Sequence, residues 1–318
     1  MTNPQFQISN PKSVSVVVPI YNGEADLPDL INCLRSQTYP SDRLEYLLVD
    51  NASSDRTPTI LQTAAQNYPQ IHQLTENKIQ SSYAARNTGI RAATGEIIAF
   101  TDADCRPEPN WLSDLIQPFQ DATIGIVAGE VIGLPGNTIL EKYAENNDTL
   151  SQKYTLAHPF CPYGQTANLA IRKEIFQQVG LFRPYLTTGG DADICWRIQR
   201  ETDWKITLAE SAIVKHRHRS TIKEFQSQWK RYGRSNRYLH ELYGVKLMPS
   251  LTPPEYLYRL SRWLLKELPI SAVKVTIGKA SVVDLINTPI YLINSTARSV
   301  GQKKAKLSEK EKIIDKLE

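Results

Sequence analysis

The sequence has few cysteines and no long apolar run, and both absences exclude classes of protein. Its four cysteines form no CxxC pair in 318 residues, so neither a zinc ribbon nor a disulfide framework is predicted. A reduced, cytoplasmic setting is the default expectation. No run of about 18 apolar residues occurs, so no spanning helix is expected. The first 12 residues are polar and lack the apolar core of a signal peptide.

The sequence also lacks a strong charge imbalance. Its net charge of +4 is too mild on its own to indicate a nucleic-acid partner. Hydrophobic residues make up 41% and charged residues 22% of the chain, a balance that argues against a disordered chain. The length suits one large or two modest domains, either with a substantial core. No internal repeat or low-complexity linker divides it.

The first part of the chain alternates between apolar strands and helices. The β-branched run at 13–21 predicts a strand buried on both faces. Four strand–helix repeats indicate right-handed crossovers and a parallel sheet, an α/β fold that binds ligands at the carboxyl ends of its strands. The predicted strands are 13–21, 44–50, 71–76 and 96–102, and the predicted helices are 24–37, 54–67, 79–93 and 109–119.

The second part of the chain is less regular. A charged tail at the end, KKAKLSEKEKIIDKLE, is expected to fray. Further helices are expected between about 252 and this tail. The other predicted elements are strands at 124–134, 168–172 and within 204–216, and helices at 137–153, from Asp191 onward, and at 222–241.

The fourth strand ends in two carboxylates, Asp102 and Asp104, one residue apart. Like charges at that separation repel, and burying either one alone is costly. Mg²⁺ or Mn²⁺ with phosphate oxygens would offset this repulsion, because both ions prefer carboxylate ligands. The alternative is a solvated acidic turn. Polar clusters after two other predicted strands, at 19–24 and 50–55, favour the metal site.

Other polar residues at the predicted sheet edge have two interpretations each. Asp50 could accept hydrogen bonds from a nucleobase or ribose, or it could form a turn before Asn51. Arg86 and Arg91 lie on one predicted helix and could face a diphosphate. They could also be solvated helix arginines, and for Arg91 the solvated interpretation is favoured.

A second acidic pair, Asp191 and Asp193, follows Gly189 and Gly190. The glycines permit a backbone bend before a helix. Asp191 would then lie at the helix start, as a general base facing a cleft or as an N-cap, and spacing alone does not separate the two. Asp193 suits the first turn because acidic groups there complement the helix dipole.

Residues 215–237 form a basic segment with eight Lys or Arg and one acid, Glu224. His216 and His218 alternate on a predicted strand, where one could bind a metal or a phosphate or both could lie at the surface. The helix that follows would either pack an aromatic face and solvate a basic one, or attract phosphates or anionic lipid. Its basic face comprises Lys223, Lys230, Arg234 and Arg237.

Six segments in order along residues 14 to about 241 resemble family 2 glycosyltransferases of the GT-A fold. The resemblance implies a GT-A-type domain at 13–245, with a nucleotide-binding half at about 13–135 and an acceptor half at about 136–245. A tail at 1–12 precedes it and a helical extension at 246–318 follows. The six segments are VSVVVPIYNGE, LLVDNASSDRT, AARNTGIRAATGEIIAFTDADC, TANLAIRKEIFQQVGLF, GGDADICWRI and HRHRST.

The resemblance implies a donor site, a metal site and an acceptor side. Asp191 matches the residue that such enzymes use as a general base on the acceptor hydroxyl. The family usually has Glu where this chain has Gly190, which is one departure from its pattern. The implied acceptor side comprises Asn168, Gly190 and Asp193. The implied metal ligands are Asp104 and His216. The implied nucleotide-sugar site comprises Pro19, Tyr21, Glu24, Asp50, Arg86 and Asp102.

The resemblance also implies an activity. The enzyme would move a sugar from a nucleotide-diphosphate donor, expected to be a UDP-sugar, to a hydroxyl of a glycan or lipid-linked acceptor. It would invert the anomeric carbon and require Mg²⁺ or Mn²⁺. The implied setting is polysaccharide or cell-envelope biosynthesis in the cytoplasm. An anionic membrane surface is a further candidate partner, with peripheral binding to the inner face, and a nucleic acid is not.

Two alternatives stay open at this point. A sugar nucleotidyltransferase also combines an α/β sheet with metal-binding aspartates, but it needs a Gly-rich loop near the first strand, where Gly23 stands alone. An inactive, glycan- or lipid-binding relic of the fold is the non-enzyme alternative. Retention of Asp102, Asp104 and Asp191 argues against a relic, whereas the missing Glu before Asp191 favours one.

Overall fold

The computed structural model describes residues 11–317, which form two compact units. Unit 1 consists of Ser151–His216 and the described residues of Met1–Ile132 and Glu309–Glu318. Unit 2 consists of Gly133–Leu150 and Arg217–Ser308. The predicted limits at 13–245 and 246–318 describe functional domains. The two compact units follow other boundaries and do not test those limits, which stay predictions. The predicted tail at 1–12 lies almost entirely outside the described residues.

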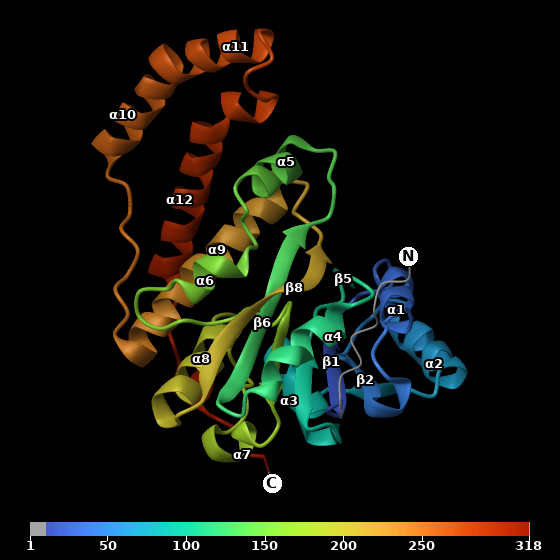
Figure 1. The fold of residues 1–318 in the computed structure, drawn as a ribbon. Helices are drawn as coiled ribbons and strands as arrows, with labels where there is room; N and C mark the ends of the chain where they lie inside the picture. Colours follow the sequence, from blue (N-terminus) through green and yellow to red (C-terminus); the bar gives the residue numbers. More distant parts are fainter. Residues whose placement is uncertain (1–10, 318) are drawn as a thin grey trace. The chain divides into compact units, whose positions relative to one another are not determined.

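Unit 1 is built on an eight-stranded sheet with the order β3-β2-β1-β4-β7-β6-β8-β5. Figure 1 labels β1, β2, β5, β6 and β8 of this sheet. Strands β1 to β4 pair in parallel, which confirms the predicted α/β class and the predicted parallel sheet. Strand β7 is antiparallel to β4 and β6, and β5 is antiparallel to β8. The strands are β1 (Val14–Ile20), β2 (Leu44–Asp50), β3 (Ile71–Thr75), β4 (Ile97–Phe100), β5 (Cys105–Pro107), β6 (Ile124–Gly133), β7 (Leu169–Arg172) and β8 (Lys205–His216).

The helices of unit 1 cover this sheet with apolar side chains. Helix α3 packs on β1, which is buried on both faces, as its continuous β-branched run predicts. The rings of Phe100 on β4 and Phe182 meet edge to face with centroids 5.6 Å apart. The helices are α1 (Leu27–Arg35), α2 (Thr57–Asn67), α3 (Ser82–Ala92), α4 (Trp111–Ile116), α6 (Gln152–Leu156), α7 (Ile175–Val179) and α8 (Gly190–Glu201), with 3₁₀ turns at Ser41–Arg43, Gln117–Gln120 and Glu309–Lys312.

The strand register places the polar strand ends at one edge of the sheet. Ile20 at the end of β1 pairs with Asp50 at the end of β2. Strand β4 runs parallel to β1 on its other side, so the segment after Phe100 leaves the sheet at the same edge. The three polar clusters that the sequence analysis singled out therefore follow neighbouring strands.

Unit 2 is helical. The predicted helix at 137–153 is two helices, α5 and α6, because the chain turns at Asp148, whose φ is +45°. Helices α9 and α12 approach closely at Gly233 and Gly301, since a Cβ at either glycine would overlap a backbone carbonyl of the other helix. The helices are α5 (Ile139–Asn146), α9 (Ile222–Tyr243), α10 (Pro253–Arg262), a π-helical turn (Trp263–Glu267), α11 (Leu268–Thr276), a 3₁₀ turn (Val282–Leu285) and α12 (Asn287–Lys304).

The charged tail docks on unit 1, so the expectation that it frays is wrong. Arg183 donates a hydrogen bond to the carbonyl of Lys312. The backbone N–H of Leu181 donates to the carbonyl of Asp315 at 2.8 Å, and the Asp315 carboxylate lies 2.9 Å from Arg91 Nη2. The sequence pattern favours the solvated interpretation for Arg91, but the residue forms an ion pair with Asp315. The tail's charges match groups far away in the sequence, which local composition does not reveal.

Within residues 11–317, no helix combines the length and apolar character needed to cross a bilayer.

Candidate functional site

The loop after β1 is held by the start of α2. Asn22 has a φ of +49°, and its side-chain oxygen accepts a hydrogen bond from the backbone N–H of Ser54 at 2.9 Å. The Glu24 carboxylate accepts from the backbone N–H of Arg56 at 2.9 Å and pairs with its Nε at 3.2 Å. These bonds attach the loop that follows Pro19 and Ile20 of β1 to the segment just before α2. The ring of Tyr21 in this loop is exposed.

Asp50 ends β2 as a buried carboxylate. Its Oδ1 accepts a hydrogen bond from the backbone N–H of Ser53 at 3.2 Å, so the turn that the sequence allowed for is present. The following residue, Asn51, donates to the carbonyls of Glu76 and Ile79 at 2.8 and 2.9 Å. This ties the end of β2 to the chain between β3 and α3.

An ion pair joins α3 to the segment that follows β4. The Arg86 guanidinium is buried, and its Nη2 lies 2.6 Å from Asp102 Oδ1. The guanidinium carbon of Arg86, Cζ, lies 5.6 Å from the centroid of the Tyr83 ring on the same helix. Arg86 Nε is buried and has no hydrogen-bond partner among the described residues. Leaving a buried donor unsatisfied is costly, and this N–H is a hydrogen-bonding capacity that the described residues leave unused.

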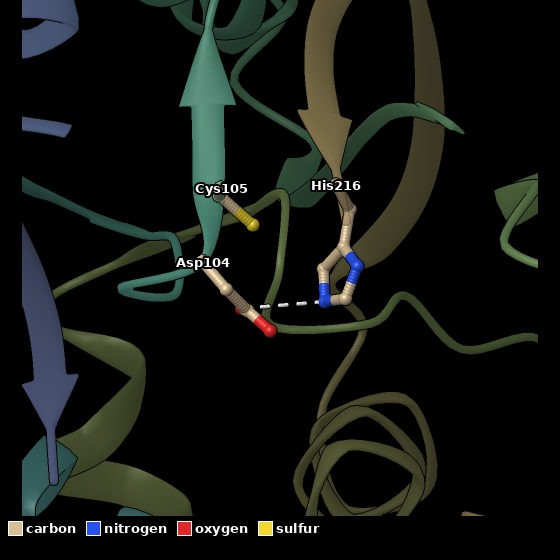
Figure 2. A group of neighbouring side chains, drawn as sticks. All are labelled: Asp104, Cys105 and His216. Carbon is tan, nitrogen blue, oxygen red and sulfur yellow. Dashed lines mark ion pairs between the residues drawn. The ribbon is translucent and has the colours of Figure 1, made fainter. Parts of the chain in front are cut away.

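Asp104, Cys105 and His216 form the one group of potential metal ligands found among the described residues, with ligand atoms within 4.8 Å of one another. The antiparallel pairing of β5 with β8 sets Cys105 opposite His216. Asp104 Oδ1 lies 3.3 Å from His216 Nε2, and Figure 2 shows the two side chains directed toward each other. The arrangement brings together the two residues that the sequence analysis proposed as metal ligands.

Cys105 is the member of this group that sequence reasoning missed. Burial, and then the charges of Asp102 and Asp104, raise the pKa of its thiol well above the ordinary value. A thiol binds metals as the thiolate, so Asp104 and His216 are better candidate ligands than Cys105. Its contact with His216 depends on β5, a three-residue strand that its sequence pattern did not reveal.

Asp191 lies half-buried at the start of α8. Its Oδ1 accepts a hydrogen bond from Thr166 Oγ1 at 2.9 Å. Burial raises the pKa of the Asp191 carboxyl above its ordinary value of 3.8, and the charge of Asp102 adds to this, while Arg86 and Thr166 act in the opposite direction. The charges of Arg86 and Asp102 therefore both act on the Asp191 carboxyl.

Gly190, the departure from the family pattern, has a local explanation. Its backbone N–H donates to the Tyr83 hydroxyl at 2.9 Å. A Cβ at residue 190 would lie 2.6 Å from Cζ of the Tyr83 ring, closer than side chains approach. Gly189 before it has a φ of +82°, which favours glycine. The Tyr83 ring thus occupies the space that a Glu at 190 would need.

Asp193 and Asn168, both predicted on the acceptor side, lie in the interior of unit 1. Asp193 is fully buried and pairs with Arg183 Nε at 2.9 Å and with Arg197 Nη2 at 3.1 Å. Asn168 accepts from the Trp111 indole at 2.7 Å and donates to two backbone carbonyls. Both side chains therefore make contacts that stabilise the interior of unit 1. Their contact with an acceptor stays a prediction.

The basic segment continues into unit 2. Phe225 is buried there, and its ring meets those of Tyr143 and Trp229 edge to face. The aromatic side of α9 is therefore packed. On the predicted basic face Lys223, Lys230 and Arg234 are exposed, whereas Arg237 pairs with Glu241. Attraction of this face to lipid stays a prediction.

Comparisons with known proteins agree on one family. The profile of "Glycosyl transferase family 2" matches residues 15–180. The "Glycosyltransferase AglE" of Haloferax volcanii is 35% identical over 207 residues, which cover 64% of this chain and 66% of that protein. The "Pre-mycofactocin glycosyltransferase" of Mycobacterium tuberculosis is 28% identical over 229 residues, which cover 70% and 47%. This chain thus spans about half to two thirds of these relatives.

A solved structure supports the fold. The mannosyltransferase PcManGT of Pyrobaculum calidifontis, determined in complex with GDP-Man and Mn²⁺, superposes with a TM-score of 0.64 at 20% identity. The match covers 93% of this chain and 88% of that one. At this identity the likeness concerns the fold alone.

Proposed function

Because this chain belongs to glycosyl transferase family 2, we propose that it transfers a sugar from a nucleotide-diphosphate donor to an acceptor hydroxyl, with inversion at the anomeric carbon. The observation that carries the proposal is the half-buried Asp191 carboxylate, whose pKa burial raises and on which the charges of Arg86 and Asp102 act, in a chain that also brings Asp104 and His216 together. These groups divide into a base, a donor site and a metal site.

The donor would bind along the edge formed by the ends of β1, β2 and β4. Asp50 would accept hydrogen bonds from the base, and Asp102 from the ribose. Arg86 is the residue best suited to an anionic oxygen, because its guanidinium is buried and its Nε has no partner among the described residues. We propose a UDP-sugar as the donor. The likeness to PcManGT, which binds GDP-Man, makes a GDP-sugar the first alternative to test.

Asp104 and His216 would hold Mg²⁺ or Mn²⁺. A carboxylate oxygen and a neutral imidazole nitrogen, 3.3 Å apart and only partly exposed, are ligands that Mn²⁺ accepts, and the carboxylate alone would serve Mg²⁺. The ion would stabilise negative charge on the leaving diphosphate. Mn²⁺ in the PcManGT structure supports this assignment without deciding between the two ions.

Asp191 would act on the acceptor. Its carboxylate would take the proton of the acceptor hydroxyl, whose oxygen forms a bond to the anomeric carbon as the bond to the diphosphate oxygen breaks. Attack from the side opposite the diphosphate inverts that carbon. The raised pKa makes Asp191 a stronger base than an exposed aspartate. Thr166 Oγ1 would hold the carboxylate in position.

We propose a glycan or a lipid-linked glycan as the acceptor class. The exposed basic residues of α9 support a lipid-linked acceptor, since phosphate groups in such molecules attract Lys and Arg.

A binding panel and a transfer assay test the proposal together. Thermal unfolding would be followed with UDP, GDP, their sugar conjugates and Mn²⁺, and donor turnover would be measured with Mn²⁺, with Mg²⁺ and with excess EDTA. We expect stabilisation by a nucleoside diphosphate, and metal-dependent turnover that Asp104→Ala abolishes. Asp203→Ala, which removes an exposed carboxylate elsewhere in unit 1, is the matched control.

Three results would contradict the proposal. Full turnover in EDTA would remove the metal from the mechanism. Consumption of a nucleoside triphosphate and a sugar phosphate, without transfer from a sugar nucleotide, would identify a nucleotidyltransferase instead. Absence of both binding and turnover would favour an inactive relic of the fold.

A further inference from the structure

Helices α10 and α11 and the π-helical turn between them form one continuous helical segment, residues 253–276, which we call the arm (Figure 1). None of its residues is buried. Its sequence is nevertheless apolar along much of its length, from YLYRL through WLL to AVKV. A surface helix of a globular protein normally buries its apolar stripe, so the arm departs from the usual pattern.

The arm turns polar side chains toward its own unit. Arg259 lies 5.0 Å above the centroid of the Tyr291 ring of α12. The Trp263 indole N–H donates to the carbonyl of Leu285 at 2.8 Å. Glu267 accepts from Thr288 Oγ1 at 2.5 Å. Three residues spaced by four along the arm therefore fix one polar side against the rest of unit 2.

The leucines of the arm are left outside. Leu257, Leu264 and Leu265 follow the i, i+7, i+8 spacing of one helix face. Their exposed fractions are 65%, 55% and 78%. Val273 and Ile277 extend this exposure beyond the π-helical turn. An apolar surface of this kind marks an interaction site or an aggregation hazard, and no residue among 11–317 covers it.

Cationic residues adjoin the exposed leucines. The segment 253–279 carries five basic and two acidic residues. Leu265 shares a shallow pocket with Lys266 and with Arg262, whose Nε is paired with Glu267 at 3.0 Å. Tyr258 and Ser261 complete its lining. Leucine beside lysine and arginine, with tyrosine at the boundary, matches a layer in which acyl chains lie directly below phosphates. The apolar face of a protein partner would not require this flanking positive charge.

We propose that the arm is a docking surface for an anionic lipid bilayer. The arm would lie along the membrane surface, with Leu257, Leu264 and Leu265 among the acyl chains and the exposed Lys266 and Lys274 at the lipid phosphates. This inference rests on the arm alone. It holds or fails independently of the transfer reaction, because no residue of the proposed site belongs to the arm.

Vesicle flotation tests the proposal with the full chain. One set of vesicles contains phosphatidylcholine alone, and another contains phosphatidylcholine mixed with phosphatidylglycerol. We expect binding to the anionic set, with weaker binding at high salt. Leu264→Gln/Leu265→Gln should lower the partition coefficient by about tenfold or more, since two apolar side chains leave the bilayer. Glutamine keeps the charge and favours helix formation.

Two matched controls separate the arm from general surface effects. Ile222→Gln alters an apolar side chain of unit 2 that is 56% exposed, like Leu264, but lies outside the arm, and it should bind normally. Lys266→Gln/Lys274→Gln should weaken binding to the anionic set more than Lys142→Gln/Lys205→Gln, which removes the same charge from exposed positions elsewhere. Far-ultraviolet circular dichroism checks that each variant is folded.

Other occupants of the arm would give other results. Sedimentation velocity measures whether the chain is a dimer and whether Leu264→Gln/Leu265→Gln makes it a monomer. A leucine-dependent dimer that ignores vesicles would assign the arm to a second copy of the chain and overturn the proposal. A monomer that ignores anionic vesicles, or binding that the arm variants leave unchanged, would overturn it as well.

Discussion

The two sides of the first turn of α8 carry the same residue type in opposite settings. Asp191 is half-buried, with a neutral donor, Thr166, on its carboxylate. Asp193, two residues further on, is fully buried and held by Arg183 and Arg197. Asp193 is thus fixed in two ion pairs inside unit 1. Burial raises the pKa of the Asp191 carboxyl, which makes it a better proton acceptor. Neighbours, not residue type or helix position, separate the two roles.

Among the variants that test this difference, Asp191→Asn should have the largest effect, and that effect is on kcat. Asn keeps the shape of the side chain but cannot take a proton, so we expect kcat to fall by about 10²- to 10⁴-fold. The affinity for donor nucleotide, measured by calorimetry, should barely change, because the proposed donor site consists of other residues, Asp50, Arg86 and Asp102 among them. A normal rate in this variant would show that another group is the base.

Replacing Asp193 by Ala should act on folding. Arg183 and Arg197 would be left buried without their carboxylate, and such a loss costs about 3–5 kcal/mol of unfolding free energy. Urea denaturation measures it, with Asp203→Ala as the control for an exposed carboxylate. Unchanged stability together with a collapsed rate would reverse the roles of the two aspartates.

Thr166→Ala sharpens the comparison on the Asp191 side. One hydrogen bond to a carboxylate is lost, worth about 1 kcal/mol, so kcat should fall about fivefold. Thr166→Ser restores a hydroxyl and should recover most of the rate. If Ala and Ser behave alike, the threonine contributes through packing and does not position the carboxylate.

The pH dependence of kcat should show the smallest of these effects. Burial and the charge of Asp102 raise the pKa of Asp191, and Arg86 and Thr166 only partly oppose them. The protonated, inactive form therefore persists above the ordinary pKa of 3.8, and the rate should fall with decreasing pH through a value higher than this. Thr166→Ala removes a bond that lowers the pKa, so it should move this acid limb to slightly higher pH.

The parallel part of the fold could be predicted because its signals are local. Strand β2 matches its predicted limits, 44–50, since a continuous apolar run bounded by polar residues defines it. Strand β5 has three residues and could not be found in this way. The predicted helix at 137–153 failed at Asp148, because its positive φ depends on the surrounding chain and not on apolar periodicity.

The same limit applies to the site. Asp102 and Asp104 could be singled out from the end of an apolar strand, and Asp191 from the glycines before a helix. Their partners are distant in the sequence: Thr166 reaches Asp191 from the segment before β7, and Tyr83 of α3 explains Gly190. Spacing within one segment gives a residue's place on its element. It does not give the neighbour that raises a pKa or fills a space.

The docked tail has a consequence for dividing the gene into expressible fragments. The chain leaves unit 1 after His216 and returns to it at Glu309. A fragment ending at residue 216 would contain every residue of the proposed site but would lack the acceptors that Arg91 and Arg183 use on Asp315 and Lys312. A minimal version should therefore replace 217–308 with a flexible linker and keep 309–317, rather than end the reading frame early.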